Sequence, residues 1–270
     1  MIKKILFPTD FSPAAHKAFA YAISIAKKAD SRVDVIHVYP EPGKGKALYM
    51  DPKQFRNDRK VFQKDMKKKM AEFIKPYDTN AIGSQAVFPS DETTNKIIEF
   101  SDHKYDLIIM GTKGERNALN KIIGSITTKT MMNAHCPVLA IPNDTEIKDL
   151  RSITYSTSLK EKDDSFLKSL SEFADLFGAS IEYLHVVDNS EDQALGNLKA
   201  KGLSADASNV HLVKNTSVLN GVDYFLKEHQ TDVLALFIPK RTFLDKLFHK
   251  SVTKKLTFYA GIPLFVVNEK

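Results

Sequence analysis

A glycine-containing stretch, residues 110–127, carries the residues most suited to binding a phosphate group. It leaves an apolar run, passes Gly111 and Gly114, and enters a helix-like segment at Gly124-Ser125. Glycine lets backbone N–H groups approach a ligand without a Cβ in the way, and a helix N-terminus offers unpaired donors and partial positive charge. Hydroxyl side chains in this segment add further donors. The stretch therefore predicts a phosphate pocket, and glycines that serve only as turns and a helix cap are the alternative.

A carboxylate, Asp10, lies just after the first strand-like run, Ile5-Leu6-Phe7. In a doubly wound parallel sheet, ligands bind beyond the carboxyl ends of the strands, at the switch point where the strand order reverses. Asp10 and Gly111 would both emerge at that point. We therefore expect the carboxylate and the glycine stretch to face one ligand.

The chain contains two copies of one pattern. Each copy begins with an apolar run, and a strand-like run that contains a histidine follows it. Two further apolar runs come later, the first preceded by an aspartate and the second by a proline. The matching residues are Ile5 and Ile153, His37 and His185, Asp106 and Asp232, and Pro137 and Pro263. The spacing is 32 residues from isoleucine to histidine and 31 from aspartate to proline in both copies. Each copy is long enough for a core of its own, which indicates two tandem domains and not a solenoid.

We place the domains at residues 1–145 and 146–270, with a linker at 145–149. The residue numbers of matching positions differ by 148 near the start of the two copies and by 126 near their end. The first copy therefore carries about 22 additional residues, which we place between Pro40 and Ala81. This insert predicts a helix with an apolar stripe and otherwise basic faces. The stripe is Phe55, Phe62, Met66, Met70 and Phe73. A solvated helix packed through that stripe is our first interpretation; an anionic partner or a membrane surface is the alternative.

The elements that position these residues alternate between strands and helices. The first copy predicts strands at 5–7, 33–38, 85–88, 107–110 and 138–141, and helices that begin at Pro13, span 91–101 and span 125–132. The second copy repeats this order, and a helical stripe at 166–177 ends at Gly178. Strands joined by helical crossovers predict an α/β fold: two tandem doubly wound domains, each a five-stranded parallel sheet flanked by helices.

The pattern Gly-x-x-Gly, nine residues, then Gly-Ser, paired with Pro8-Thr9-Asp10 and the His37-Val38 strand, resembles the universal stress protein family. The resemblance extends over essentially the whole chain as a tandem pair, with a Rossmann-like fold of the adenine-nucleotide-hydrolase type. It implies ATP, often with Mg²⁺ or Mn²⁺: the residues around Asp10 contact the sugar and base, Val38 lies against adenine, and the glycine stretch holds the phosphates. The residues nominated in this way are Pro8, Thr9, Asp10, Val38, Met110, Gly111, Lys113, Gly114, Gly124, Ser125, Ile126 and Thr127.

The second copy departs from this pattern. Phe237, Lys240 and Lys250 stand at the positions of the three glycines, and Ser158 stands at the position of Asp10. Side chains there should obstruct a phosphate, so we expect no ATP in the second domain. A closed pocket is our first interpretation, and a different anion held by Lys240, Arg241 and Lys250 is the alternative.

Composition excludes several classes of protein. A net charge of +6, 43% hydrophobic residues and one cysteine fit a globular chain without internal disulfides. No apolar run suits a membrane span, so we expect a cytoplasmic protein with no membrane and no specific nucleic acid as partner. His37 and His185 are interpreted as core or strand-end histidines, and Cys136 as inert packing.

Two classes of function remain. The first is an ATP-binding regulatory or stress-response module that acts on an unknown protein partner. The second is a slow ATPase or a phosphoryl- or adenylyl-transferring enzyme that uses the same pocket; no catalytic residue is assigned. A scaffold without nucleotide is a third reading. The resemblance also implies pairing of final strands, Val138–Ile141 against Leu264–Val267, which gives a pseudo-dimeric monomer, with a homodimer as the alternative.

Overall fold

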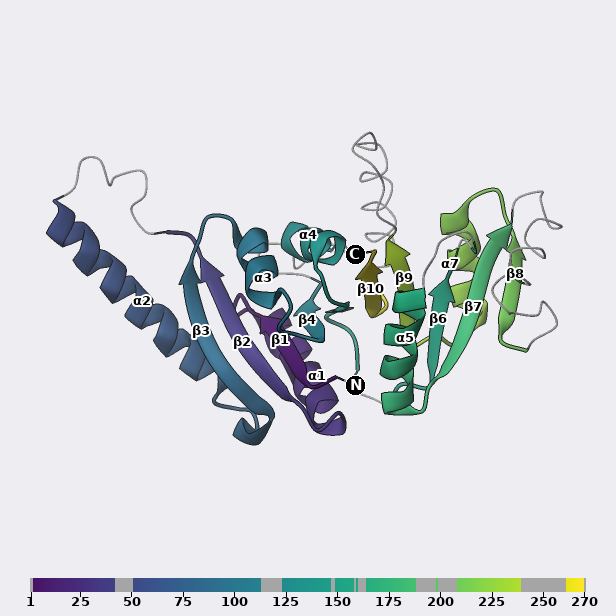
Figure 1. The fold of residues 1–270 in the computed structure, drawn as a ribbon, viewed down its shortest axis with the longest axis horizontal. Coiled ribbons are helices and arrows are strands. Elements are labelled where there is room, and N and C mark those ends of the chain that lie inside the picture. The colour runs from purple at the N-terminus through teal and green to yellow at the C-terminus, as the bar shows by residue number, and fades with distance from the viewer. Residues whose placement is uncertain are drawn as a thin grey trace.

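The computed structural model describes residues 2–41, 51–112, 123–146, 149–157, 159, 164–187, 198, 208–238 and 261–269 of the 270-residue chain. The strands of the first half are β1 (Lys4–Pro8), β2 (Arg32–Tyr39), β3 (Ile82–Pro89), β4 (Leu107–Gly111) and β5 (Val138–Ile141). Those of the second half are β6 (Ser152–Ser156), β7 (Ser180–Val187), β8 (Val210–Lys214), β9 (Val233–Ile238) and β10 (Leu264–Asn268). They form one sheet in the order β3-β2-β1-β4-β5-β10-β9-β6-β7-β8 (Figure 1).

Helices cover both faces of this sheet. The helices on one face are α1 (Pro13–Lys28), α2 (Pro52–Ile74) and α5 (Asp164–Phe177). Those on the other are α3 (Thr93–Ser101), α4 (Ser125–Asn133) and α7 (Val218–Glu228). Successive strand residues alternate between the two cores, so Ile5 and Phe7 pack on the α1 face and Leu6 packs on the α4 face. The predicted α/β fold with a mostly parallel sheet flanked by helices is confirmed.

Local sequence signals explain where the helices begin and end. Ser12 caps α1 because its Oγ accepts a hydrogen bond from the Ala15 N–H at 3.1 Å, and Pro13 follows as the first helical residue. Gly178 ends α5 with φ at +64°, and the Ala179 N–H after it donates to the Ala174 carbonyl at 3.0 Å. Both termini agree with the sequence prediction.

The two halves meet edge to edge. β10 pairs antiparallel with β5, with Leu264 opposite Ala140, Phe265 opposite Leu139 and Val266 opposite Val138. The predicted pairing of these two strands is confirmed. Each of the two main hydrophobic cores contains residues from both halves. The seam is therefore packed on both faces of the sheet.

The insert is helical, as predicted. Met66, Met70 and Phe73 of α2 are buried, whereas Phe62 is 36% exposed. The amino-terminal part of α2 projects beyond the edge of the sheet formed by β3 (Figure 1).

Candidate functional site

The strand order places a switch point between β1 and β4. From β1 the chain builds β2 and β3 on one side, and it then returns to form β4 on the other side of β1. Leu6 pairs with Ile108, and Pro8 pairs with Ile36, so the residues that follow β1, β2 and β4 reach the same edge of the sheet. This edge is where an open α/β sheet binds ligands.

A tight turn after β1 holds Asp10 at this edge. The Thr9 N–H donates to the Ile36 carbonyl at 2.8 Å, and the Thr9 Oγ1 accepts from the Phe11 N–H at 3.0 Å. One Asp10 carboxylate oxygen accepts from the Ser12 N–H at 3.1 Å. Phe11 takes a left-handed conformation with φ at +64°. Asp10 is exposed, and the hydrogen bonds of Thr9 before it and of Phe11 and Ser12 after it hold the turn in place.

His37 ties the end of β2 to the same turn. Its Nδ1 lies 2.7 Å from the Thr9 carbonyl oxygen, and because a carbonyl only accepts, this nitrogen carries the proton. Burial lowers the pKa of His37 below its ordinary value, although the bond to Thr9 and the charge of Asp10 act in the opposite direction. The Phe11 ring packs against the imidazole with centroids 4.2 Å apart. His37 is therefore a strand-end clamp, in agreement with its sequence interpretation.

The other side of the edge is formed by the end of β4 and the start of α4. The Gly124 N–H donates to the Thr112 carbonyl at 2.6 Å, and the Thr127 hydroxyl donates to the Gly111 carbonyl at 2.8 Å. Gly124 is the N-cap of α4 and makes no side-chain cap bond. Among the described residues, no side chain caps the first-turn N–H groups of α4, which lie at this edge. The Thr127 hydroxyl, expected to be a ligand donor, donates to this backbone carbonyl in the structure.

Thr112 was not singled out by the sequence. Its side chain is fully buried at the end of β4, and its hydroxyl has no hydrogen-bond partner among the described residues. A threonine in a loop of mixed composition gives no signal for this, because its burial depends on the strands on either side.

The structure brings ten of the twelve predicted site residues to this edge. They are Pro8, Thr9, Asp10, Val38, Met110, Gly111, Gly124, Ser125, Ile126 and Thr127. Lys113 and Gly114 lie outside the described residues. Val38 is 9% exposed and Met110 is 5% exposed, and both pack in the hydrophobic core on the α4 face of the sheet. Ser125 and Ile126 are exposed at the first turn of α4.

The second half repeats the histidine clamp. The Nδ1 of His185 lies 2.8 Å from the Thr157 carbonyl oxygen, and the Thr157 Oγ1 accepts from the Leu159 N–H at 3.0 Å. Leu159 has φ at +61°, matching Phe11. These contacts match those of Thr9, Phe11 and His37 in the first half.

The glycine side differs between the halves. Gly111 pairs with Ile141 in the first half, and Phe237 pairs with Val267 at the same register in the second. The Phe237 ring packs against Phe166 with centroids 5.6 Å apart. An aromatic ring thus stands where the first half has no side chain. Ser158, Lys240, Arg241 and Lys250 lie outside the described residues.

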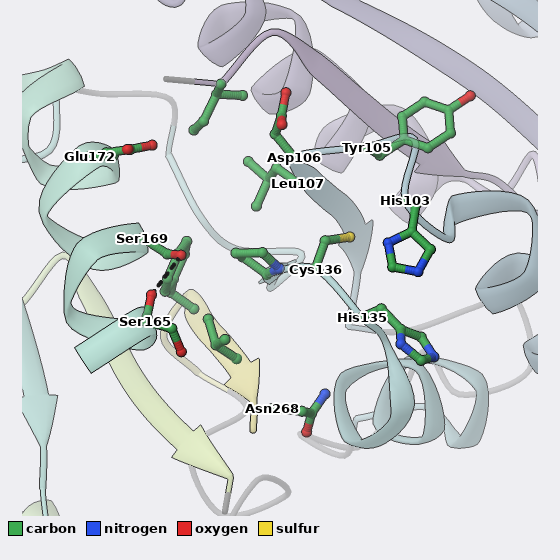
Figure 2. Close-up of a pocket in the computed structure, with 14 residues that line it drawn as sticks. His103, Tyr105, Asp106, Leu107, His135, Cys136, Ser165, Ser169, Glu172 and Asn268 are labelled. Atoms are coloured by element: carbon green, nitrogen blue, oxygen red, sulfur yellow. Dashed lines mark hydrogen bonds between the residues drawn. The ribbon is translucent and has the colours of Figure 1, made fainter. Parts of the chain in front are cut away.

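A separate cavity of about 290 Å³ lies where β4, β5, β10 and α5 meet (Figure 2). It is at the amino ends of β4 and β5, and its walls include His103, His135, Cys136 and Glu172. None of the predicted ligand residues lines it. Across the described part of the chain, no group of three His, Cys, Asp or Glu side chains is placed to hold a metal ion. No helix among the described residues is long and apolar enough to cross a membrane.

Comparison with known proteins gives consistent results. Residues 1–142 match the Universal stress protein family. A universal stress protein of Methanocaldococcus jannaschii is 33% identical over 149 residues, which cover 52% of this chain and 82% of the relative. A second universal stress protein from that organism is 26% identical over 154 residues, which cover 52% of this chain and 95% of the relative. The crystal structure of a universal stress protein from Archaeoglobus fulgidus superposes with a TM-score of 0.71 over 99% of this chain and 98% of that one, at 16% identity, and so shares the fold.

Proposed function

Because the chain belongs to the universal stress protein family, we propose that it is an ATP-binding regulatory module of the stress response, with nucleotide bound in its first half only. In this proposal residues 1–145 form the nucleotide-binding domain, and residues 146–270 form a second domain with a degenerate pocket. The module works in the cytoplasm, which fits a chain with a single cysteine.

The observation that carries the proposal is the meeting of three groups at one switch point. The Asp10 carboxylate stands at the end of β1, the apolar Val38 at the end of β2, and the uncapped N-terminus of α4 beyond β4. A carboxylate accepts hydrogen bonds from ribose hydroxyls, an apolar surface suits a purine, and a helix N-terminus suits phosphates. These are the three chemical parts of ATP.

The glycines supply room for the phosphates. Gly124 leaves the approach to the α4 N–H groups free of a side chain of its own, and among the described residues a Cβ added there would meet only the Thr112 carbonyl oxygen at 3.5 Å, an ordinary contact. The described packing does not require a glycine at this position, which fits a role of Gly124 in admitting the ligand. In the proposal Lys113 and Gly114 complete the phosphate loop.

Mg²⁺ or Mn²⁺ would be held jointly by the nucleotide and the protein. Mg²⁺ commonly binds through one or two carboxylates together with substrate phosphates and water. Asp10 is the carboxylate among the nominated residues that can take this role. The cation neutralises phosphate charge, and the chain's own groups orient the sugar and exclude water from the base.

In a regulatory module, ATP acts by binding one conformation more tightly than another. The nominated residues bind and orient and include no assigned acid or base, which favours this reading over a slow ATPase or a transferring enzyme. Steady-state ADP release by the purified protein separates the two readings.

The test of the proposal is a lysine placed at Gly124. Gly124→Lys introduces the residue that the second half carries at this position, and we expect MgATP to bind at least about tenfold more weakly, a loss of about 1.4 kcal/mol. Tyr224→Lys is the matched control, because Tyr224 lies 58% exposed on α7. Equilibrium dialysis with labelled ATP measures both. Equal affinity of Gly124→Lys and the control would reject the proposed site.

A further inference from the structure

α2 carries a continuous line of cations. Between Pro52 and Ile74 the helix has eight Lys and Arg residues against three Asp and Glu. Five of the cations follow one another at intervals of three, four, four and three residues, which places them on one face of an α-helix. This cationic stripe consists of Lys53, Arg56, Lys60, Lys64 and Lys67.

The cationic stripe faces solvent. All five side chains are exposed, and within the described part of the chain none of them makes an ion pair. The pairs that α2 does form use other cations, such as Arg59 with Glu41 at 2.8 Å and Lys69 with Asp65 at 3.5 Å. The three carboxylates of the helix are spaced seven residues apart and lie on a different face from the cationic stripe. They are Asp58, Asp65 and Glu72. The stripe is therefore an uncompensated positive surface about 21 Å long.

The remaining faces of α2 are already used. The buried residues Met66, Met70 and Phe73 attach the helix to the sheet, and they lie about 120° around the helix from the stripe. Phe62 contacts Tyr39 with ring centroids 5.3 Å apart. The helix is thus held by its apolar stripe and presents its cations outward, on a segment that projects beyond β3 (Figure 1).

We propose that the cationic stripe of α2 binds the phosphate backbone of double-stranded nucleic acid without regard to sequence. Straight rows of Lys and Arg suit a polyphosphate, whose binding is driven by release of condensed counterions. Four of the five residues are lysines, which make phosphate contacts but are depleted at protein–protein interfaces. The stripe also contains no aromatic or aliphatic anchor, which a protein partner would need.

A membrane surface fits less well. Amphipathic helices that bind lipid insert an apolar face opposite their charges. In α2 the carboxyl-terminal part of that face, with Met66, Met70 and Phe73, is buried in the body of the protein. The large exposed apolar side chains of the helix are Val61, at 70% exposure, and Phe62, at 36%. On a membrane surface the cationic stripe would contribute only electrostatic attraction to anionic lipids.

The experiment measures binding of the full chain to a fluorescein-labelled DNA duplex of mixed sequence, by anisotropy at several salt concentrations. With five phosphate contacts, we expect log K to fall with log salt at a slope of about −4.5, which is about a 500-fold loss of affinity between about 50 and 200 mM salt. The triple variant Lys60→Gln, Lys64→Gln, Lys67→Gln should reduce the slope by about 2.7. The corresponding Lys→Arg triple keeps the charge and should bind as the unmodified protein does.

A second triple, Lys17→Gln, Lys168→Gln, Lys214→Gln, removes the same charge from exposed positions on other elements and should keep the slope. Equal slopes for both Gln triples would overturn the proposal, because net charge alone would then explain binding. No DNA binding at low salt would overturn it as well, and binding instead to phosphatidylcholine vesicles that contain phosphatidylserine would assign the stripe to a membrane. Circular dichroism confirms that each variant is folded.

Discussion

His37 and the Thr9 carbonyl join the ends of two strands beside the proposed ATP site. The bond length of 2.7 Å and the packing of Phe11 on the imidazole fix the turn that presents Asp10. The same bond occurs in the second half, between His185 and Thr157, where the sequence has Ser158 at the position of Asp10. The clamp therefore shapes the strand ends in both halves and does not depend on the carboxylate.

The clamp predicts a pH dependence of stability. Burial lowers the pKa of folded His37 below the ordinary value of 6.5, so the unfolded chain binds a proton that the folded chain does not. The contribution of His37 is therefore complete above about pH 6.5 and is lost as pH falls from there through the folded pKa. Urea unfolding of the wild type and His37→Gln at pH 7.5 and 5.5 measures it. We expect the stability gap between the two proteins to be wider at pH 7.5; a gap that is constant or wider at pH 5.5 contradicts this explanation.

For single residues, the sequence predicted which of them lie at one edge of the sheet, but it did not predict the contacts that they make there. The spacing of Gly111 and Gly124 and the position of Asp10 after an apolar run pointed to one edge of a sheet, and the structure brings them there. The donation by the Thr127 hydroxyl to Gly111 and the left-handed Phe11 were not predictable. Both depend on how a turn packs against neighbouring strands, and no local residue type encodes that.

At the scale of elements, the packing of α7 on β7 requires a glycine. A Cβ added to Gly221 would lie 2.6 and 2.7 Å from the two γ carbons of Val186, closer than side chains normally approach. We expect Gly221→Ala to destabilise the protein by about 1–2 kcal/mol, since the overlap outweighs the better helix propensity of alanine. Denaturant unfolding measures the change.

A double-mutant cycle checks the cause. If the overlap with Val186 is responsible, the change Gly221→Ala should cost much less in a Val186→Ala background. The same cost in both backgrounds would show that the destabilisation has another origin.

Element boundaries were predicted well where a local signal exists. Ser12-Pro13 predicted the start of α1 and Gly178 the end of α5. The start of α3 was expected at Asp91 but lies at Thr93, and its N-cap, Glu92, makes no side-chain cap bond. With no capping signal, the boundary is set by tertiary packing. The apolar stripe of α2 likewise predicted the helix but not that its amino-terminal part would leave the body of the protein.

At the scale of the whole molecule, antiparallel pairing of β5 and β10 places both strands inside the sheet. Among the described strands, the two ends of the sheet are β3 and β8. Unpaired strand edges are the sites where another chain can pair, whereas β5 and β10 already pair with each other. The two halves thus pair their final strands within one chain.

This arrangement predicts a monomer. Analytical ultracentrifugation of the full chain should give a mass near 30.3 kDa that does not change with concentration. A mass twice that value, across the concentration range, would favour the homodimer and would mean that another surface carries the association.

Calorimetric titration of the metal- and nucleotide-stripped full chain with MgATP measures whether nucleotide binds in the first half only. The proposed site of Asp10, Gly111 and Gly124 predicts one equivalent of ATP per chain, because Phe237 stands in the second half at the register position of Gly111. Two equivalents of ATP would contradict the degenerate second pocket. No detectable heat, together with an unchanged melting temperature, would contradict ATP binding by this chain.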